Sequence, residues 1–172
     1  QGRVVAGAQS GMLYALDAAT GEPAWTFDVH GEILGAPSFF APADPAKPPV
    51  LFQIERGEGI FHALDFTKGT ELWKTDPIAR CDGHASAANG IAVYGSCASA
   101  LHAYDATAGR ILNNIPLCDD CQVASGIALA GDEAYVGNRS GQVVRANLRT
   151  GQILWKFTES EKEVFTTPAL SK

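Results

Sequence analysis

The amino-acid sequence predicts an all-β fold built from four repeated units, each of them a small antiparallel sheet. Short segments alternate apolar and polar residues and are separated by turns rich in Gly, Thr and Asp, which is typical of strands joined by tight turns. No segment has apolar residues at i, i+3, i+4 and i+7 over two turns, so helical repeats are excluded. The third observation is recurrence, in the stretches GMLYALDAATGEPAWTF, GIFHALDFTKGTELWKT, SALHAYDATAGRILNNI and GQVVRANLRTGQILWKF.

The four copies align without gaps. An Asp or Asn ends the central strand of each copy, and these residues are 48, 40 and 42 positions apart. A Gly follows four residues later, and a Trp or Asn follows after four more. The aligned residues are Asp17, Asp65, Asp105 and Asn147; Gly21, Gly69, Gly109 and Gly151; and Trp25, Trp73, Asn113 and Trp155. This period is that of the blades of a propeller.

Each copy contains three predicted strands. In the first copy they are RVVAG, MLYALD and EPAWTF, separated by the turns AQSG and AATG. A fourth strand is expected between copies, at residues 33–40, 83–90, 124–131 and 165–171. Four-stranded antiparallel sheets at this spacing predict a β-propeller, in which each blade packs both faces against its neighbours.

A chain of 172 residues is long enough for one domain with its own core. The predicted repeats are approximately 1–28, 29–76, 77–116 and 117–158, and residues 159–172 form an inner strand that closes the first blade or starts the next. The sequence permits a closed ring of four blades, or half or a segment of a ring of seven or eight.

The composition of the chain limits the classes of partner that it is expected to bind. The net charge is −6 and the 13 Lys and Arg residues are scattered, so no nucleic-acid partner is expected. No apolar run approaches the roughly 18 residues of a membrane helix. We expect a soluble module, with a protein partner or a second half of the propeller bound to it.

The recurring aromatic residues are interpreted as structural. Trp25, Trp73 and Trp155 are predicted to dock between adjacent blades, because even spacing along the chain does not converge on one ligand site. The Asp of each copy is expected to close its turn by accepting backbone hydrogen bonds. Asn113 stands where a Trp is expected, which suggests weaker packing there or a face with another role.

At these residues the chain resembles the pyrroloquinoline quinone (PQQ) propeller family, in which a strand ending Ala-Leu-Asp is followed by x-x-Thr-Gly and a docking Trp. The stretch LYALDAATGEPAWTF carries the resemblance most closely, and TTPALS resembles the innermost strand of the family. The resemblance implies the propeller fold. The family includes dehydrogenases, assembly scaffolds and sensor-like domains, so it leaves the function open.

All four cysteines lie in the third copy and the link to the fourth, and in a propeller they share one rim. The most local pairing is Cys81 with Cys97 and Cys118 with Cys121. Two disulfides match the oxidising compartment in which the resembled family mostly occurs, so a periplasmic or extracellular location is expected. The alternatives are a zinc site formed by all four cysteines and a redox role for CDDC.

Two functions remain open. The first is a non-catalytic scaffold that recognises a protein or small ligand through its rim loops, with no cofactor or metal. The second is a segment of a PQQ-dependent dehydrogenase whose cofactor residues lie largely outside this chain. For such an enzyme the resemblance implies PQQ with calcium, a stacked Trp and a disulfide of adjacent cysteines. The chain lacks adjacent cysteines, and its three Trp occupy docking positions, so no catalytic or cofactor-binding residue is assigned and an enzyme is not favoured.

Overall fold

The computed structural model describes residues 2–171, and this range contains fifteen strands and no helix. The strands are β1 (Arg3–Gly7), β2 (Met12–Asp17), β3 (Pro23–Asp28), β4 (Ser38–Phe40), β5 (Val50–Ile54), β6 (Phe61–Asp65), β7 (Glu71–Lys74), β8 (Ser86–Ala88), β9 (Ile91–Gly95), β10 (Ala100–Asp105), β11 (Ile111–Pro116), β12 (Ile127–Ala130), β13 (Glu133–Gly137), β14 (Val143–Asn147) and β15 (Ile153–Phe157). The predicted all-β fold is confirmed.

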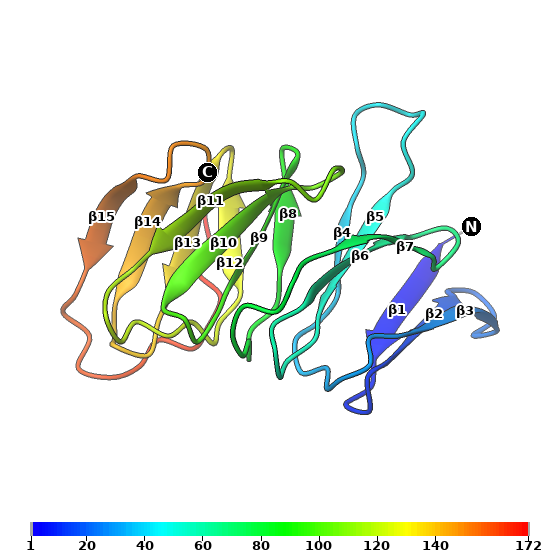
Figure 1. The fold of residues 1–172 in the computed structure, drawn as a ribbon, viewed down its shortest axis with the longest axis horizontal. Coiled ribbons are helices and arrows are strands. Elements are labelled where there is room, and N and C mark those ends of the chain that lie inside the picture. The colour runs from blue at the N-terminus through cyan, green and yellow to red at the C-terminus, as the bar shows by residue number, and fades with distance from the viewer. Residues whose placement is uncertain (1, 172) are drawn as a thin grey trace.

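The strands form four antiparallel sheets of consecutive strands: β1–β3, β4–β7, β8–β11 and β12–β15. The sheets follow one another in chain order, with β4, β8 and β12 next to each other at their inner edges. The first and fourth sheets lie at opposite ends of this row (Figure 1). The predicted antiparallel blades are therefore present. The second, third and fourth blades have four strands, and the first has three.

The same local structure ends the second-to-last strand of every blade. The pairing of the last two strands shifts register between Ala15 and Leu16, and again at the equivalent place in each later blade. Asp17 Oδ1 then accepts the backbone N–H of Ala19, and Gly21 takes a φ of +75°, a conformation that glycine adopts without steric cost. The predicted turn is confirmed by the equivalent hydrogen bonds to Asp65, Asp105 and Asn147.

Three apolar cores lie between neighbouring blades. Leu13, Val29 and Leu64 belong to the first core, Phe52, Phe61 and Tyr94 to the second, and Leu101, Val123 and Val144 to the third. The inner sheets are covered on both faces, so β5, β6 and β9 consist entirely of buried residues. This burial explains why their sequences alternate less clearly than β1 and β2 do.

The inner strands are shorter than predicted. The stretches 33–37 and 83–85, predicted as strand, belong to the links between blades. The backbone just before the inner strands of the third and fourth blades is held by a turn of the preceding blade. Cys81 N–H donates to the carbonyl of Arg56, and Val123 N–H donates to that of Ser96. Val164 N–H donates to the carbonyl of Asn138 in the same way, so the segment after β15 follows the path of a further link.

The predicted strand 165–171 is not formed. Residues 158–171 carry no strand. They run along the fourth blade, where Val164 lies against Gly137 and Ser160 lies against Gly141. Pro168 has no N–H to donate to a ladder. Thr167 lies against Gly126 of the fourth blade, much as the backbone of Ser125 lies against Gly83 one repeat earlier. The segment thus occupies the place where a following blade would begin its inner strand.

Candidate functional site

One edge of the blades carries both the turns between β1 and β2, β5 and β6, β9 and β10, and β13 and β14, and the links from each blade to the next. We call this edge the link rim, and it lies opposite the loop between β4 and β5 that projects from the other side (Figure 1). Backbone hydrogen bonds interlock the two kinds of loop. Cys97 N–H donates to Arg80 O at 2.8 Å, and Arg139 N–H donates to Gln122 O at 2.9 Å. Side chains on the link rim are therefore held by well-ordered backbone.

Three arginines on the link rim converge on Asp82. Arg56 Nε lies 2.8 Å from Asp82 Oδ1, Arg80 Nε lies 2.9 Å from the same atom, and Arg139 Nη2 lies 3.3 Å from Oδ2. They come from the turn of the second blade, the link to the third, and the turn of the fourth. Glu32 accepts a further hydrogen bond from Arg56 Nη1 at 2.6 Å. The link rim is thus tied across three blades by one carboxylate.

The electrostatics of this cluster favour the ionised carboxylate. Burial raises the pKa of Asp82, but hydrogen bonds from Arg80 and Arg56 outweigh burial and hold that pKa below its usual range. The side chain of Asp82 is only 9% exposed, whereas that of Arg80 is 52% exposed. Three guanidinium groups therefore face two carboxylates, and the side chains of Arg80 and Arg139 remain 52% and 36% exposed. Such a cluster can bind carboxylate groups of a partner by charge-assisted hydrogen bonds.

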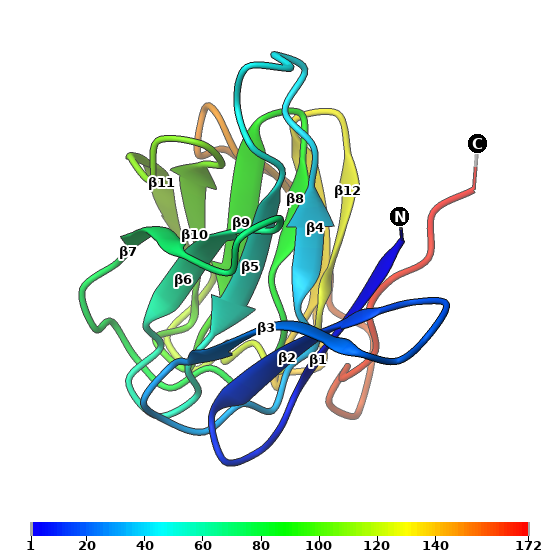
Figure 2. The same cartoon turned by 90° about the vertical axis from the view of Figure 1, so that its right-hand side faces the viewer.

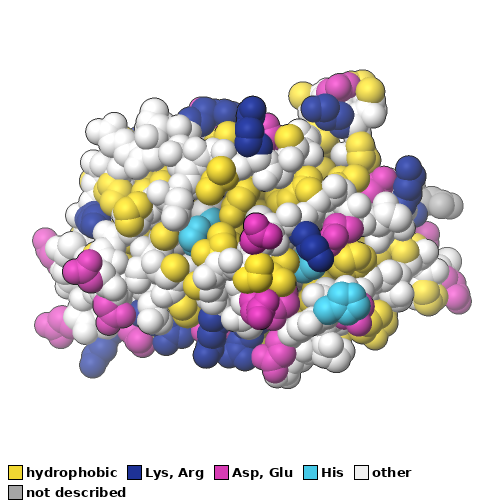
Figure 3. Space-filling view, viewed as in Figure 1, with side chains coloured by type: hydrophobic (Ala, Val, Ile, Leu, Met, Phe, Trp, Pro, Cys, Tyr) yellow, Lys and Arg dark blue, Asp and Glu magenta, His cyan; other side chains and the backbone are white. Residues whose placement is uncertain are grey.

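Basic and acidic side chains lie side by side along the lower edge of the space-filling view, where the link rim runs (Figure 3). The opposite rim has its own ion pair, in which Arg149 Nε lies 2.9 Å from Asp132 Oδ2. That pair is a single bridge at the surface, whereas the Asp82 cluster joins three loops. The link rim is therefore the candidate recognition surface.

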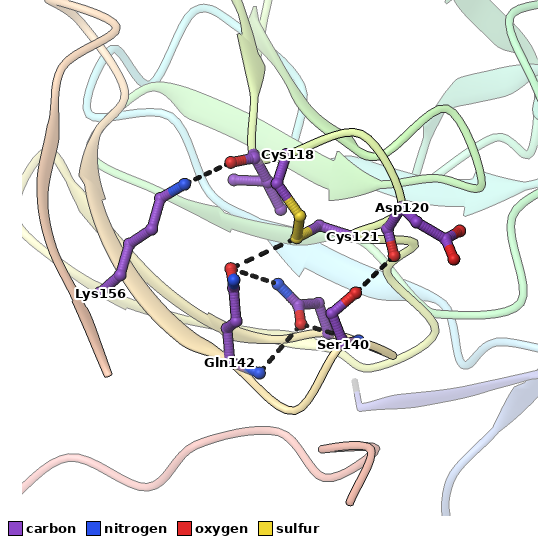
Figure 4. Close-up of a disulfide and its surroundings, with 8 residues drawn as sticks. Cys118, Asp120, Cys121, Ser140, Gln142 and Lys156 are labelled. Atoms are coloured by element: carbon purple, nitrogen blue, oxygen red, sulfur yellow. Dashed lines mark hydrogen bonds between the residues drawn. A yellow bond between two sulfur atoms is a disulfide. The ribbon is translucent and has the colours of Figure 1, made fainter. Parts of the chain in front are cut away.

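Cys118 and Cys121 form a disulfide in the link between the third and fourth blades, as the sequence predicts. Gln142 Oε1 accepts from Asn138 Nδ2 beside it, and Ser140 Oγ donates to the carbonyl of Asp120 at 2.6 Å (Figure 4). Lys156 Nζ donates to the carbonyl of Leu117 on the other side. The disulfide closes a loop of the link, and the hydrogen bond from Ser140 joins this loop to the turn between β13 and β14.

The other two cysteines differ from the sequence prediction, because Cys81 and Cys97 are thiols in the structure. Cys81 is buried and its Sγ lies 3.0 Å from the carbonyl oxygen of Gly95, so the sulfur is directed into the β9 backbone. Burial raises the pKa of the Cys81 thiol to about 12. The four cysteines do not gather around one point, and residues 2–171 contain no group of three or more His, Cys, Asp or Glu side chains placed to hold a metal ion.

At each of the three junctions between blades, the residue at the docking position packs on the turn glycine of the next blade. The Trp25 indole covers Gly69 of the next blade and donates its Nε1–H to Phe66 O at 3.0 Å. Trp73 covers Gly109, but its buried Nε1–H has no hydrogen-bond partner among the described residues. Asn113 lies against Gly151 and donates from Nδ2 to Leu148 O at 2.8 Å and Arg149 O at 2.7 Å. Asn113 therefore replaces the indole N–H with two amide N–H donors. Trp155 has no such turn beside it and is 40% exposed.

Three of the four histidines pack within the fold. His102 Nε2 lies 2.8 Å from Ser96 Oγ, and both side chains are buried, so this pair cannot reach a substrate. His62 Nδ1 lies 2.8 Å from Glu71 Oε1. His84 lies against Gly126 of the fourth blade.

Sequence reasoning missed the three arginines of the Asp82 cluster. Arg56 and Arg139 stand in equivalent turns of the second and fourth copies, and this equivalence was the available signal. What the sequence could not reveal is that both side chains reach the same carboxylate in the third link.

Blades of this topology with a repeated Trp and Gly docking contact define a β-propeller of the PQQ-like class. A family model described as outer membrane protein assembly factor BamB matches residues 1–42 and 57–172, and the chain belongs to that family.

A curated relative, the outer membrane protein assembly factor BamB of Shewanella oneidensis, is 27% identical over 184 residues, covering 96% of this chain and 43% of the relative. The crystal structure of BamB from Moraxella catarrhalis is similar with a TM-score of 0.67 and 23% identity, over 92% of this chain and 46% of that one. The designed Ika8 protein is similar with a TM-score of 0.79 and 16% identity, over 96% of this chain and 49% of that one. Saccharomyces cerevisiae Sqt1 is similar with a TM-score of 0.76 and 16% identity, over 95% of this chain and 50% of that one. The chain spans about half the length of these proteins.

Among residues 2–171 there is no helix of the length and hydropathy needed to cross a membrane.

Proposed function

We propose that this chain is a non-catalytic scaffold module that binds a protein partner through the link rim, as part of outer membrane protein assembly in the periplasm. The observation that carries the proposal is the Asp82 cluster, where three arginines from three loops are fixed on one rim with donors left for a partner. The relative's name, outer membrane protein assembly factor, supplies the assembly role. The Cys118–Cys121 disulfide supports an oxidising compartment.

The partner segment that fits this surface is acidic. Arginine binds carboxylates in a planar, two-pronged geometry, and Arg80 and Arg139 are both held by Asp82 with part of each guanidinium group exposed. A partner carboxylate would join the ion pairs already present without forcing these side chains to become ordered.

The alternative function is a segment of a PQQ-dependent dehydrogenase whose cofactor residues lie largely outside this chain, and the described residues give it no support. Trp25 and Trp73 are committed to the glycine turns of neighbouring blades and offer no free face for a quinone. Cys118 and Cys121 are three residues apart rather than adjacent. No reaction step through PQQ or calcium is derived from this chain.

The experiment is site-specific photo-crosslinking in the cells that make the protein. A crosslinking amino acid at position 119, on the link rim, should give adducts with proteins of the outer membrane assembly machinery. The same amino acid at position 108, in the turn between β10 and β11 on the opposite rim, should not.

Charge reversal supplies a matched pair of variants for this experiment. Arg80→Glu should remove the adducts formed at position 119, because it places a like charge where the acidic segment binds. Arg149→Glu changes an equally exposed arginine of the opposite rim and should leave them in place. Equal adducts from both positions, or adducts unaffected by Arg80→Glu, would contradict the proposal.

A further inference from the structure

At two of the three junctions between blades, a polar side chain of one blade donates to the carbonyl groups that begin the turn of the next blade. At the first junction Arg3 Nη1 donates to the carbonyl of Phe66 at 3.0 Å and also to that of Thr67. At the third junction Asn113 Nδ2 donates to the two equivalent carbonyls. The first and third junctions therefore each supply donors for both carbonyl groups from within the chain.

The second junction lacks these donors. The equivalent carbonyls there belong to Ala106 and Thr107, and no N–H group of residues 2–171 donates to either of them. Val50 stands where the first blade has Arg3, since each of the two pairs with the aspartate that ends the neighbouring strand. The Trp73 indole N–H, which belongs to the docking position, has no hydrogen-bond partner among the described residues. The second junction thus has the acceptors without a donor.

A pocket of about 270 Å³ lies at this junction, and we call it the second-junction pocket. Its lining is mostly apolar and consists of Lys47, Pro48, Val50, Leu72, Thr107 and Ala108. A water molecule takes up about 30 Å³, so the pocket has room for one long side chain. The equivalent place at the first junction is lined by Arg3 itself.

One wall of the second-junction pocket is the loop between β4 and β5. Figure 2 shows this loop rising beside the turn that joins β8 to β9, and residues of both line a second pocket. Four prolines among residues 41–49 restrict the loop, and Lys47 N–H donates to the carbonyl of Asp44 at 3.1 Å. A wall that is already formed lowers the entropy cost of binding. The family model leaves residues 43–56 unmatched, so this wall is not part of what the model describes.

The charge of each turn matches the charge of the side chain that donates to it. The turn reached by the cationic Arg3 is closed by Asp65. The turn reached by the neutral Asn113 is closed by the neutral Asn147. At the second junction the turn is closed by Asp105, and backbone hydrogen bonds within the turn hold the pKa of this carboxyl group below its usual range. The second junction therefore favours a cationic donor.

We propose that the second-junction pocket binds an arginine side chain of a partner protein. The guanidinium group donates to the carbonyl of Thr107, as Arg3 does to the equivalent carbonyl, and the aliphatic part of the side chain lies against Pro48 and Leu72. Lys47 is the one charged residue in the lining, and its side chain is exposed, so it can turn to solvent. The pocket lies on the rim opposite the link rim, for which we propose an acidic segment, so we assign the arginine to a separate partner.

The first test is an NMR titration of the isotope-labelled protein with an alanine–arginine–alanine peptide blocked at both ends. The backbone amide signals of Thr107, Ala108 and Gly109 should shift and saturate, with a dissociation constant on the order of millimolar because a single side chain is bound. The same peptide with citrulline in place of arginine keeps the shape and loses the charge, and it should bind about tenfold more weakly. Signals that do not saturate, or equal binding of the two peptides, would overturn the proposal.

Two buried positions provide a matched pair of variants. Val50→Arg should place a guanidinium group in the pocket as Arg3 does at the first junction, so the melting temperature should stay within about 3 °C and the peptide should no longer bind. Ile91 is the equivalent residue of the third blade, where Asn113 already donates to the turn. Ile91→Arg should therefore lower the melting temperature by about 10 °C or more. Equal losses in the two variants would show that the pocket does not accept the group.

The exposed lysines provide a test that does not touch the core. Lys47→Glu replaces a like charge at the second-junction pocket with an opposite one, so it should tighten binding of the arginine peptide about threefold to tenfold. Lys68→Glu is the control, because Lys68 is equally exposed but lies outside the lining. Unchanged or weaker binding by Lys47→Glu would mean that the arginine does not enter beside Lys47, and it would reject the proposed site.

Discussion

The indole of Trp25 packs directly on Gly69, so closely that a Cβ at position 69 would lie 2.5 Å from Trp25 Cδ2. Gly69 also has a φ of +71°, which L side chains rarely adopt. Gly69 thus has two separate reasons to be glycine. One is the turn itself, and the other is the aromatic ring of the preceding blade.

Gly69→Ala and Gly90→Ala separate these reasons. Gly90 has a φ of +76° and no atom within 4 Å of the place where an alanine methyl group would stand, so Gly90→Ala should cost only the backbone strain, about 1 kcal/mol. Gly69→Ala should lose a further 1–3 kcal/mol, roughly, because the methyl group displaces the indole. Urea unfolding of both variants measures the difference, and an equal loss in the two would show that the Trp25 contact contributes nothing.

Asn113 is expected to act as a hydrogen-bond donor rather than as a poor substitute for Trp. Its Nδ2 donates to two carbonyl groups, those of Leu148 and Arg149. Asn113→Asp replaces these donors with carboxylate oxygens that face carbonyl oxygens, so it should destabilise the protein more than Asn113→Ala does. Removing the donor alone should cost about 1 kcal/mol. Thermal unfolding ranks the two variants, and the opposite order would contradict this role.

The repeat made most of the fold predictable. The spacing of Asp17, Asp65, Asp105 and Asn147 predicts the blades because each turn is closed by local hydrogen bonds within four residues. The links are different, because their conformation depends on turns some 25 residues earlier, such as that of Arg56 holding Cys81. For this reason the inner strands were predicted too long.

At the candidate site, the cysteines and the Asp82 cluster show the same limit of what can be predicted from the sequence. The short spacing favours a disulfide between Cys118 and Cys121, because a separation of three residues brings the two sulfur atoms close together without help from the rest of the fold. The direction of Cys81 depends instead on its packing against Gly95, which no pattern in the sequence reveals. Asp82 likewise meets Arg139 across 57 residues of sequence.

His102 should make the protein sensitive to mild acid. Burial lowers the pKa of His102 from 6.5 to about 4, because the imidazolium form would lose its hydration. As the pH falls from 6.5 towards 4, His102 takes up a proton in the unfolded chain but not in the folded one, which favours unfolding. The free energy of unfolding lost over this interval is up to about 3 kcal/mol. In His102→Gln, the free energy of unfolding measured between pH 6.5 and 4 should change less with pH than in the unchanged protein.

NMR titration of the imidazole tests the same prediction without a variant. The His102 ring should remain neutral at pH values well below those at which an unperturbed histidine becomes charged. A transition near 6.5 in the folded protein would show that burial does not control this group.

Asp82 should contribute to stability at neutral pH and lose that contribution in acid. Its folded-state pKa lies below the ordinary value of 3.8, so the stabilisation is present above 3.8 and disappears as the pH falls through the lower folded-state value. Asp82→Asn should therefore lower the melting temperature at pH 7, and its difference from the unchanged protein should shrink at lower pH. A difference that stays constant with pH would mean that the charge of Asp82 is not what holds the three arginines.

Thiol labelling should distinguish all four cysteines. Peptide mapping without reducing agent should find Cys118 joined to Cys121, and Cys97, which is partly exposed, should react with iodoacetamide in the folded protein. Cys81 should react only after unfolding, because it is buried and its thiol has a pKa raised to about 12, so little thiolate exists at neutral pH. Labelling after urea treatment provides the control, since both thiols must then be modified. A Cys81–Cys97 crosslink in the peptide map would restore the pairing that the sequence predicts, and rapid labelling of Cys81 in the native protein would show that the third blade opens at its link.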